Sequence, residues 1–297
     1  MKTKILLFGM LLCILAFTSC SQDSNSATTE TMVTANDVTA NQKMDNSIDD
    51  VSLIADDQYE VSEGSTTGKS VVEYHSILPT CATISDLGST TAVRVLTITF
   101  GSETSACIFR GHSLKGQIIL TRTRGTTFPK IMTVTYNNFY INDNKLEGTS
   151  TWKREMLGSA TTVPSTLHPK TTFTMASMTL TTTAGIYTRN GERIREMTAG
   201  FLTRLSPTDD IYSTYGTFTT THPNGSVFTS LIEAATPLMN KMACSLQQPP
   251  MPFPVSGILK LTKNSHVATI DYGTGDCDNL AMQSIDGGTA TQITLGD

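Results

Sequence analysis

The sequence predicts an all-β fold, an antiparallel meander or sandwich of long hairpins that follows a disordered N-terminal tether. Threonine, which is β-branched and suits the pleated surface of a sheet, accounts for 51 of the 297 residues. Apolar and polar residues alternate in runs such as VLTITF at 95–100 and MTVTY at 132–136. The pairs Asn190-Gly191 and Asn224-Gly225 stand between such runs, as is typical of two-residue hairpin turns.

The composition argues against two classes of protein, polytopic membrane proteins and nucleic-acid-binding proteins. The chain is 38% hydrophobic and 16% charged, with a formal net charge of −5. Its sequence does not contain the several apolar runs of about 20 residues that a polytopic membrane protein needs. It also has no basic excess of the kind seen in nucleic-acid-binding proteins, so we expect no nucleic-acid partner.

Residues 1–19 have the pattern of an export signal. Lys2 and Lys4 are followed by 13 uncharged, mostly apolar residues at 5–17. This run is too short to span a bilayer comfortably, so we expect a signal peptide rather than an anchor helix.

The end of this leader, AFTSC at 16–20, resembles the lipobox of bacterial lipoproteins. The resemblance implies cleavage before Cys20, which then carries a thioether-linked diacylglycerol and an N-acyl chain, so that the membrane is a partner through the lipid anchor. The polar run SQDSN follows at 21–25 and resembles the surface-export tails of Bacteroidetes lipoproteins. Ser21 after the cysteine implies the outer membrane by proteobacterial sorting rules. The alternative is an ordinary secretory signal in which Cys20 stays unmodified.

Residues 20–70 are expected to form a lipidated, disordered acidic tether. Positions 21–70 hold ten acidic residues against Lys43 and Lys69, a net charge of −8, with little aliphatic content. Such a stretch cannot bury enough apolar surface to offset the entropy of ordering it. Residues 71–297 have a net charge of +1, so the acidity belongs to the tether rather than to the domain.

Residues 71–297 are expected to form the β domain. Strand-like runs bounded by turn residues lie at 71–76, 92–100, 116–122, 131–141, 145–152, 171–181, 193–202, 212–219, 227–232, 257–261, 267–272 and 292–295. No window of a dozen residues has a convincing helical period. TITFG at 97–101 and TIDYG at 269–273 each precede a cysteine, and this echo allows two similar β sub-domains split near 160–170. A single β domain is equally allowed by the length.

These features together resemble Bacteroidetes-type surface lipoproteins. The resemblance is carried by the lipobox, the acidic spacer, NDNKLEG at 142–148 and YGTGDCDN at 272–279. It implies an envelope location and the architecture described above, and it implies no activity.

Four cysteines lie in the predicted domain: Cys81, Cys107, Cys244 and Cys277. An even number outside the cytosol favours disulfides over free thiols. Three pairings are possible, and the echo favours Cys81 with Cys107 and Cys244 with Cys277. A zinc site is the alternative, although no Cys-x2-Cys or paired-histidine spacing accompanies these residues.

A glycine-rich acidic segment, DYGTGDCDN at 271–279, could hold calcium. Asp271, Asp276 and Asp278 would supply the hard oxygen ligands that this ion prefers, although the order differs from that of an EF-hand. The alternative is a tight turn fixed by the disulfide at Cys277. No other cofactor is expected.

The sequence shows no catalytic set. It contains no Gly-x-Ser-x-Gly elbow and no phosphate-binding glycine loop between a strand and a helix. Trp152, with Tyr136 and Tyr140, could form a platform on which a sugar stacks, although aromatic residues on paired strands more often belong to the core.

The expected function is therefore that of an outer-membrane-anchored lipoprotein whose β domain binds a glycan or a protein partner without catalysis. Two alternatives stay open at this stage. One is an extracytoplasmic hydrolase acting on a polysaccharide, which would need two suitably placed carboxylates. The other is a structural component of the cell envelope.

Overall fold

A computed structural model describes residues 32–64, 76–101, 105–125, 127–203 and 206–296, which belong to one compact unit. Its strands are β1 (Ala82–Ser85), β2 (Val93–Phe100), β3 (Cys107–Phe109), β4 (His112–Thr123), β5 (Lys130–Ile141), β6 (Asn144–Leu157), β7 (His168–Thr182), β8 (Gly185–Ala199), β9 (Ile211–Thr221), β10 (Val227–Ile232), β11 (Leu238–Lys241), β12 (Ser256–Lys263), β13 (His266–Thr274), β14 (Leu280–Ile285) and β15 (Thr291–Thr294). The helices are α1 (Ala35–Gly64), α2 (Met242–Leu246) and the 3-10 turn η1 (Pro207–Asp209).

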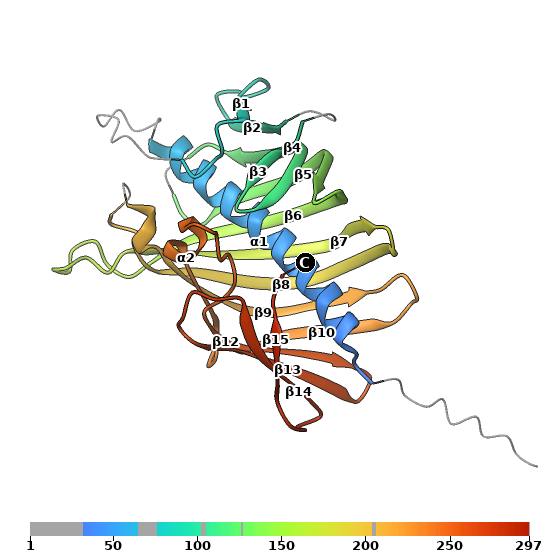
Figure 1. Cartoon of the computed structure of the whole chain (residues 1–297). Coiled ribbons are helices and arrows are strands. Elements are labelled where there is room, and N and C mark those ends of the chain that lie inside the picture. Colours follow the sequence, from blue (N-terminus) through green and yellow to red (C-terminus); the bar gives the residue numbers. More distant parts are fainter. Residues whose placement is uncertain (1–31, 65–75, 102–104, 126, 204–205, 297) are drawn as a thin grey trace, which may run out of the picture. The chain divides into compact units, whose positions relative to one another are not determined.

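All strands form one antiparallel sheet, in the spatial order β1-β2-β4-β5-β6-β7-β8-β9-β10-β12-β13-β14-β15. The short strands lie off this path, since β3 pairs with β4, and β11 pairs with β9 and β12. Spatial order follows chain order because each strand folds back on the one before it. The predicted all-β antiparallel meander is therefore confirmed, as a single sheet (Figure 1).

The sheet runs unbroken past the point where two sub-domains could divide. β6 and β7 flank residues 160–170, and they pair from Lys145 opposite Thr181 to Leu157 opposite His168. The described unit is therefore one β domain. The strand expected at 71–76 lies almost wholly outside the described residues.

The two Asn-Gly pairs behave differently. Asn224-Gly225 forms the turn between β9 and β10, with the amide of Gly225 donating to the carbonyl of His222. Asn190-Gly191 instead lies inside β8, where the pairing with β7 shifts register, so the hairpin predicted there is wrong. A Cβ at Gly191 would lie 2.4 Å from the carbonyl oxygen of Thr217 on β9, so glycine permits close approach of two strands at a bulge.

The helix α1 occupies residues that were expected to be disordered. It begins with a capping box, because the amide of Asp37 donates to the hydroxyl of Thr34, and the amide of Thr34 donates to the carboxylate of Asp37. Figure 1 shows α1 running obliquely across the strands of the sheet. The prediction of a tether over 20–70 is thus wrong for Ala35–Gly64, and positions 20–31 and 65–70 lie outside the described residues.

Apolar side chains of α1 and of the segment before it belong to the core. Five of them pack into a cluster with strands β2 to β9: Met44, Ile48, Val51, Ile54 and Ala55. Val33 and Val38 pack into a second cluster with β10 to β15. The same face of the sheet is thereby covered along most of its width, which explains why so polar a helix is stable there.

The acidic residues of α1 meet arginines on the covered face of the sheet. Arg154 of β6 pairs with Asp56 at 3.0 Å and also with Glu60, and Arg189 of β8 pairs with Asp45. Further pairs join Asp50 to Arg110 at 3.0 Å, Asp49 to Arg195 at 3.4 Å and Asp45 to Arg193 at 3.5 Å. The expectation failed because the charges of positions 35–64 are neutralised by the sheet rather than by solvent.

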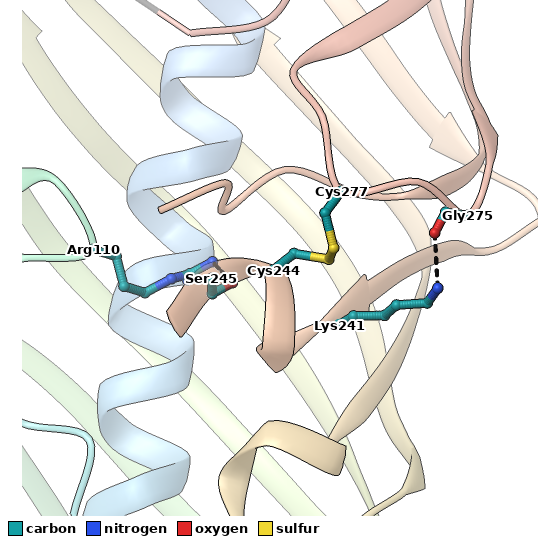
Figure 2. The surroundings of a disulfide bond; sticks show 6 residues. All are labelled: Arg110, Lys241, Cys244, Ser245, Gly275 and Cys277. Atoms are coloured by element: carbon teal, nitrogen blue, oxygen red, sulfur yellow. Dashed lines mark hydrogen bonds between the residues drawn. A yellow bond between two sulfur atoms is a disulfide. The ribbon is translucent and has the colours of Figure 1, made fainter. Parts of the chain in front are cut away.

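Both disulfides have the pairing that the sequence favoured. Cys81, just before β1, is bonded to Cys107 of β3, and Cys244 of α2 is bonded to Cys277 after β13. The second bond attaches α2 to the loop that follows β13. Beside it, Arg110 donates to the hydroxyl of Ser245 at 2.8 Å (Figure 2).

Candidate functional site

An open pocket lies where a bulge interrupts the pairing of β4 and β5. The register shifts between Lys115 and Gln117, opposite Asn138. Asn138 has a φ of 46°, and a Cβ at Gly116 would lie 1.8 Å from its carbonyl oxygen. Only glycine allows this approach, and the extra residue turns the side chains of Asn137 and Asn138 outward while Phe139 stays in the core.

The pocket has a volume of about 560 Å³, within the range of about 300–1,000 Å³ that is usual for ligand sites. Ile118, which follows Gln117 on β4, is fully buried in the core cluster that includes α1. Because side chains alternate along a strand, Gln117 points to the opposite face of the sheet. The pocket is lined by Gly101, Lys115, Gly116, Gln117, Asn137, Asn138, Tyr140 and Asp143.

Three polar contacts hold part of this lining in place. Asn137 donates to the side-chain oxygen of Gln117 at 2.8 Å, and Gln117 donates to the hydroxyl of Thr99 at 3.1 Å. The ammonium of Lys115 and the carboxylate of Asp143 are 2.9 Å apart and neutralise one another. The pocket therefore carries no net charge, and its polar character comes from amides.

Two groups in the pocket remain available to a ligand. The side chains of Asn138 and Tyr140 form no hydrogen bond with any residue in the described part of the chain. An amide both donates and accepts, and a tyrosine offers a flat apolar ring with a hydroxyl at its tip. Such a set can bind a neutral molecule that carries hydroxyl groups and an apolar face.

Only one of the three predicted aromatic residues reaches this pocket. Trp152 is 2% exposed, and its ring centroid lies 4.5 Å from that of Phe173, with the two rings nearly perpendicular. The prediction that Trp152 belongs to a binding platform is therefore wrong, and this residue belongs to the core. Tyr136 stacks on Phe139 at 5.7 Å, and burial raises the pKa of its phenol. Tyr140 is half-buried and lines the pocket.

The amides of the pocket were not identified from the sequence. Gln117, Asn137 and Asn138 lie in runs that were expected to be ordinary strands. The signal was present, because the pair Asn137-Asn138 breaks the alternation of an otherwise regular strand opposite a glycine. Such a break in a strand is typical of a bulge.

The acidic segment at 271–279 does not bring its carboxylates together. Asp271 accepts from the amide of Gly273 at 2.9 Å, and Asp278 accepts from the amide of Leu280 at 3.0 Å. Lys241 donates to the carbonyl of Gly275 at 2.8 Å, which puts a cation in the middle of the loop (Figure 2). Neither Asp271, Asp276 and Asp278 nor any other described set of three acidic, histidine or cysteine residues is grouped to hold a metal ion.

The predicted lipidation site, Cys20, lies outside the described residues. Among the helices that are described, none is both long and apolar enough to cross a membrane.

No family model, curated protein or solved structure matches the chain.

Proposed function

We propose that this protein is an outer-membrane lipoprotein, attached through Cys20, whose β domain binds a neutral glycan without catalysis. The observation that supports the glycan is the pocket between β4 and β5, with its uncharged amide lining and its half-buried Tyr140. Sugars combine hydroxyl groups with apolar C–H faces, and the pocket offers partners for both.

Replacement of Tyr140 is expected to weaken glycan binding about tenfold, since burying a side chain of this size contributes about 1.5–3 kcal/mol and 1.4 kcal/mol is a factor of ten. The measurement is calorimetric titration of the full chain and of Tyr140→Ala with a panel of neutral oligosaccharides. Asn138→Asp is a second variant, because Asp tolerates the positive φ at this position but has no amide donor.

Ile131→Ala is the matched control for this experiment. Ile131 lies on the same strand, is 45% exposed and does not line the pocket. The proposal fails if no neutral oligosaccharide binds the full chain, or if Tyr140→Ala and Ile131→Ala bind it equally well. Binding of an envelope protein that is unchanged in both variants would favour a protein partner elsewhere on the domain.

Removal of the Cys20 thiol is expected to release the protein from membranes. Without the thiol no diacylglycerol can be attached, and anchoring depends on acyl chains that each contribute about 0.8 kcal/mol per buried CH₂. The measurement is fractionation of cells that express the natural chain or Cys20→Ala, after growth with a labelled fatty acid.

Cys13→Ala serves as the control, since this cysteine lies inside the leader. If Cys20→Ala still carries acyl label and still sediments with membranes, the anchoring proposal is wrong.

A further inference from the structure

A second, smaller cavity lies between the C-terminal half of α1 and the start of β9. Its volume of about 50 Å³ has room for roughly three to five water molecules. Apolar side chains form part of its wall, among them Leu53, Met197 and Met242. Six charged side chains also line it, namely Asp56, Asp57, Glu60, Arg154, Arg195 and Asp210.

Three of the four carboxylates in this cavity have hydrogen-bond or ion-pair partners within the protein. Asp56 and Glu60 pair with Arg154, as described above. Asp57 accepts from the hydroxyl of Ser76 at 2.6 Å and from the amide of Ile77 at 3.1 Å.

Asp210 differs from the other three acids. Its carboxylate makes no hydrogen bond or ion pair with any residue that the structure describes. Burial, together with the like charges of Asp209 and Glu60, raises its pKa to about 7. A Cβ at Gly200 would lie 2.1 Å from Oδ1 of Asp210, so only glycine at position 200 leaves room for the Asp210 carboxylate in the wall of the cavity.

A second polar group in the wall of the cavity also has an N–H without a hydrogen-bond acceptor. The side chain of Arg195 is 6% exposed, and its Nη1 donates no hydrogen bond within the described chain, although it lies 3.6 Å from Asp56. A buried N–H without an acceptor is costly, and a ligand oxygen would remove that cost.

We propose that this cavity binds a small protonated amine that also carries a hydrogen-bond acceptor. The ammonium group pairs with the carboxylate of Asp210, and the ligand's acceptor atom accepts a hydrogen bond from Nη1 of Arg195. The short hydrocarbon chain packs on Met197 and Met242. Four carboxylates against two guanidinium groups leave a negative excess that one cationic group reduces. This site is separate from the amide-lined pocket, which is neutral and lies on the opposite face of the sheet.

The test uses the full chain and 4-aminobutan-1-ol as the probe, titrated at pH 8 and followed by NMR chemical shifts. We expect saturable binding that weakens at least tenfold in Asp210→Asn, which keeps the shape of the side chain and removes its charge. Asp209→Asn is the matched control, because this neighbouring carboxylate accepts from Thr203 and does not line the cavity. It should bind the probe within a factor of two of the natural chain.

Two further arms separate the ammonium contact from simple filling of the cavity. Butane-1,4-diol has the same length and no ammonium group, and it should bind at least tenfold more weakly. Binding of the amine should strengthen about tenfold between pH 6 and pH 8 as Asp210 loses its proton, and this dependence should vanish in Asp210→Asn. The other charged groups around Asp210 are Asp209 on η1, the three acids of α1 and the two arginines; all of them remain in Asp210→Asn, and Asp209→Asn removes only the charge of Asp209.

The proposal is overturned if the folded natural chain shows no binding of 4-aminobutan-1-ol up to 100 mM. It is also overturned if Asp210→Asn binds the amine as tightly as Asp209→Asn does, or if the diol binds as tightly as the amine.

Discussion

A chain that begins at residue 70 is expected to lack a cooperative unfolding transition, whereas a chain that begins at residue 32 should unfold in one step. The shorter chain loses α1, and with it the apolar residues that fill the centre of the larger cluster. It also leaves the guanidinium groups of Arg154, Arg189 and Arg195, each nine-tenths or more buried, without their carboxylates. An isolated sheet with one uncovered apolar face and several unpaired cations has no compact state of comparable stability.

The measurement is urea unfolding of both chains, followed by circular dichroism and by the fluorescence of Trp152. Both chains lack residues 1–31, so they differ only in residues 32–69. A cooperative transition of equal midpoint in the two chains would contradict the role of α1 in the core.

Replacement of Arg189 by methionine is expected to lower the free energy of unfolding by about 3–5 kcal/mol. This arginine is fully buried, pairs with Asp45 of α1 and donates to the hydroxyl of Thr220 at 3.0 Å. Methionine fills a similar volume but leaves the Asp45 carboxylate buried, and among the described residues Arg193 at 3.5 Å is then its one remaining cationic partner. Removal of one partner of a buried pair costs more than the pair itself contributes, because the remaining charge is desolvated.

Two comparisons test this explanation. Lys260→Ala removes an ion pair with Glu233 that is exposed on both sides, and it should change the stability by no more than about 1 kcal/mol. Asp45→Asn added to Arg189→Met should restore part of the lost stability, since the uncompensated charge is then gone. Equal losses in Arg189→Met and Lys260→Ala, or no recovery in the double variant, would show that the buried charge is not the cause.

Much of the sheet could be predicted from the sequence because its information is local. Alternation in VLTITF at 95–100 and MTVTY at 132–136 marks β2 and β5, and Asn224-Gly225 marks a hairpin turn. The disulfide pairs could also be predicted from an echo in the sequence. The strands β1, β3 and β11 were not predicted because each has only three or four residues, too few to show a period, and β14 was also not predicted.

The helix could not be predicted in the same way, because its partners are remote in the sequence. Met44, Ile48, Val51 and Ala55 recur at spacings of four, three and four, which is helical. The ten acidic residues at 21–70 outweighed this weak stripe and indicated disorder. The arginines that neutralise α1 are spread from position 110 to position 195, and nothing local in the sequence links them to it.

The candidate site was only partly predictable for a related reason. Tyr140 was identified by residue type, but type alone could not separate it from Trp152, which lies in the core. The difference depends on the bulge at Gly116 and Asn138, which changes the side that each later side chain of β5 faces. A single inserted residue thus decides which aromatic ring meets solvent.

The contacts of α1 also constrain the order in which the chain can fold. The side chain of Asn41 meets that of His222 at 3.0 Å, a separation of 181 residues, and Val38 packs against strands that begin later still. The first helix to be made therefore has no complete binding surface until nearly the last strands exist. High contact order of this kind slows folding, and it places the docking of α1 after synthesis of the last strands rather than during it.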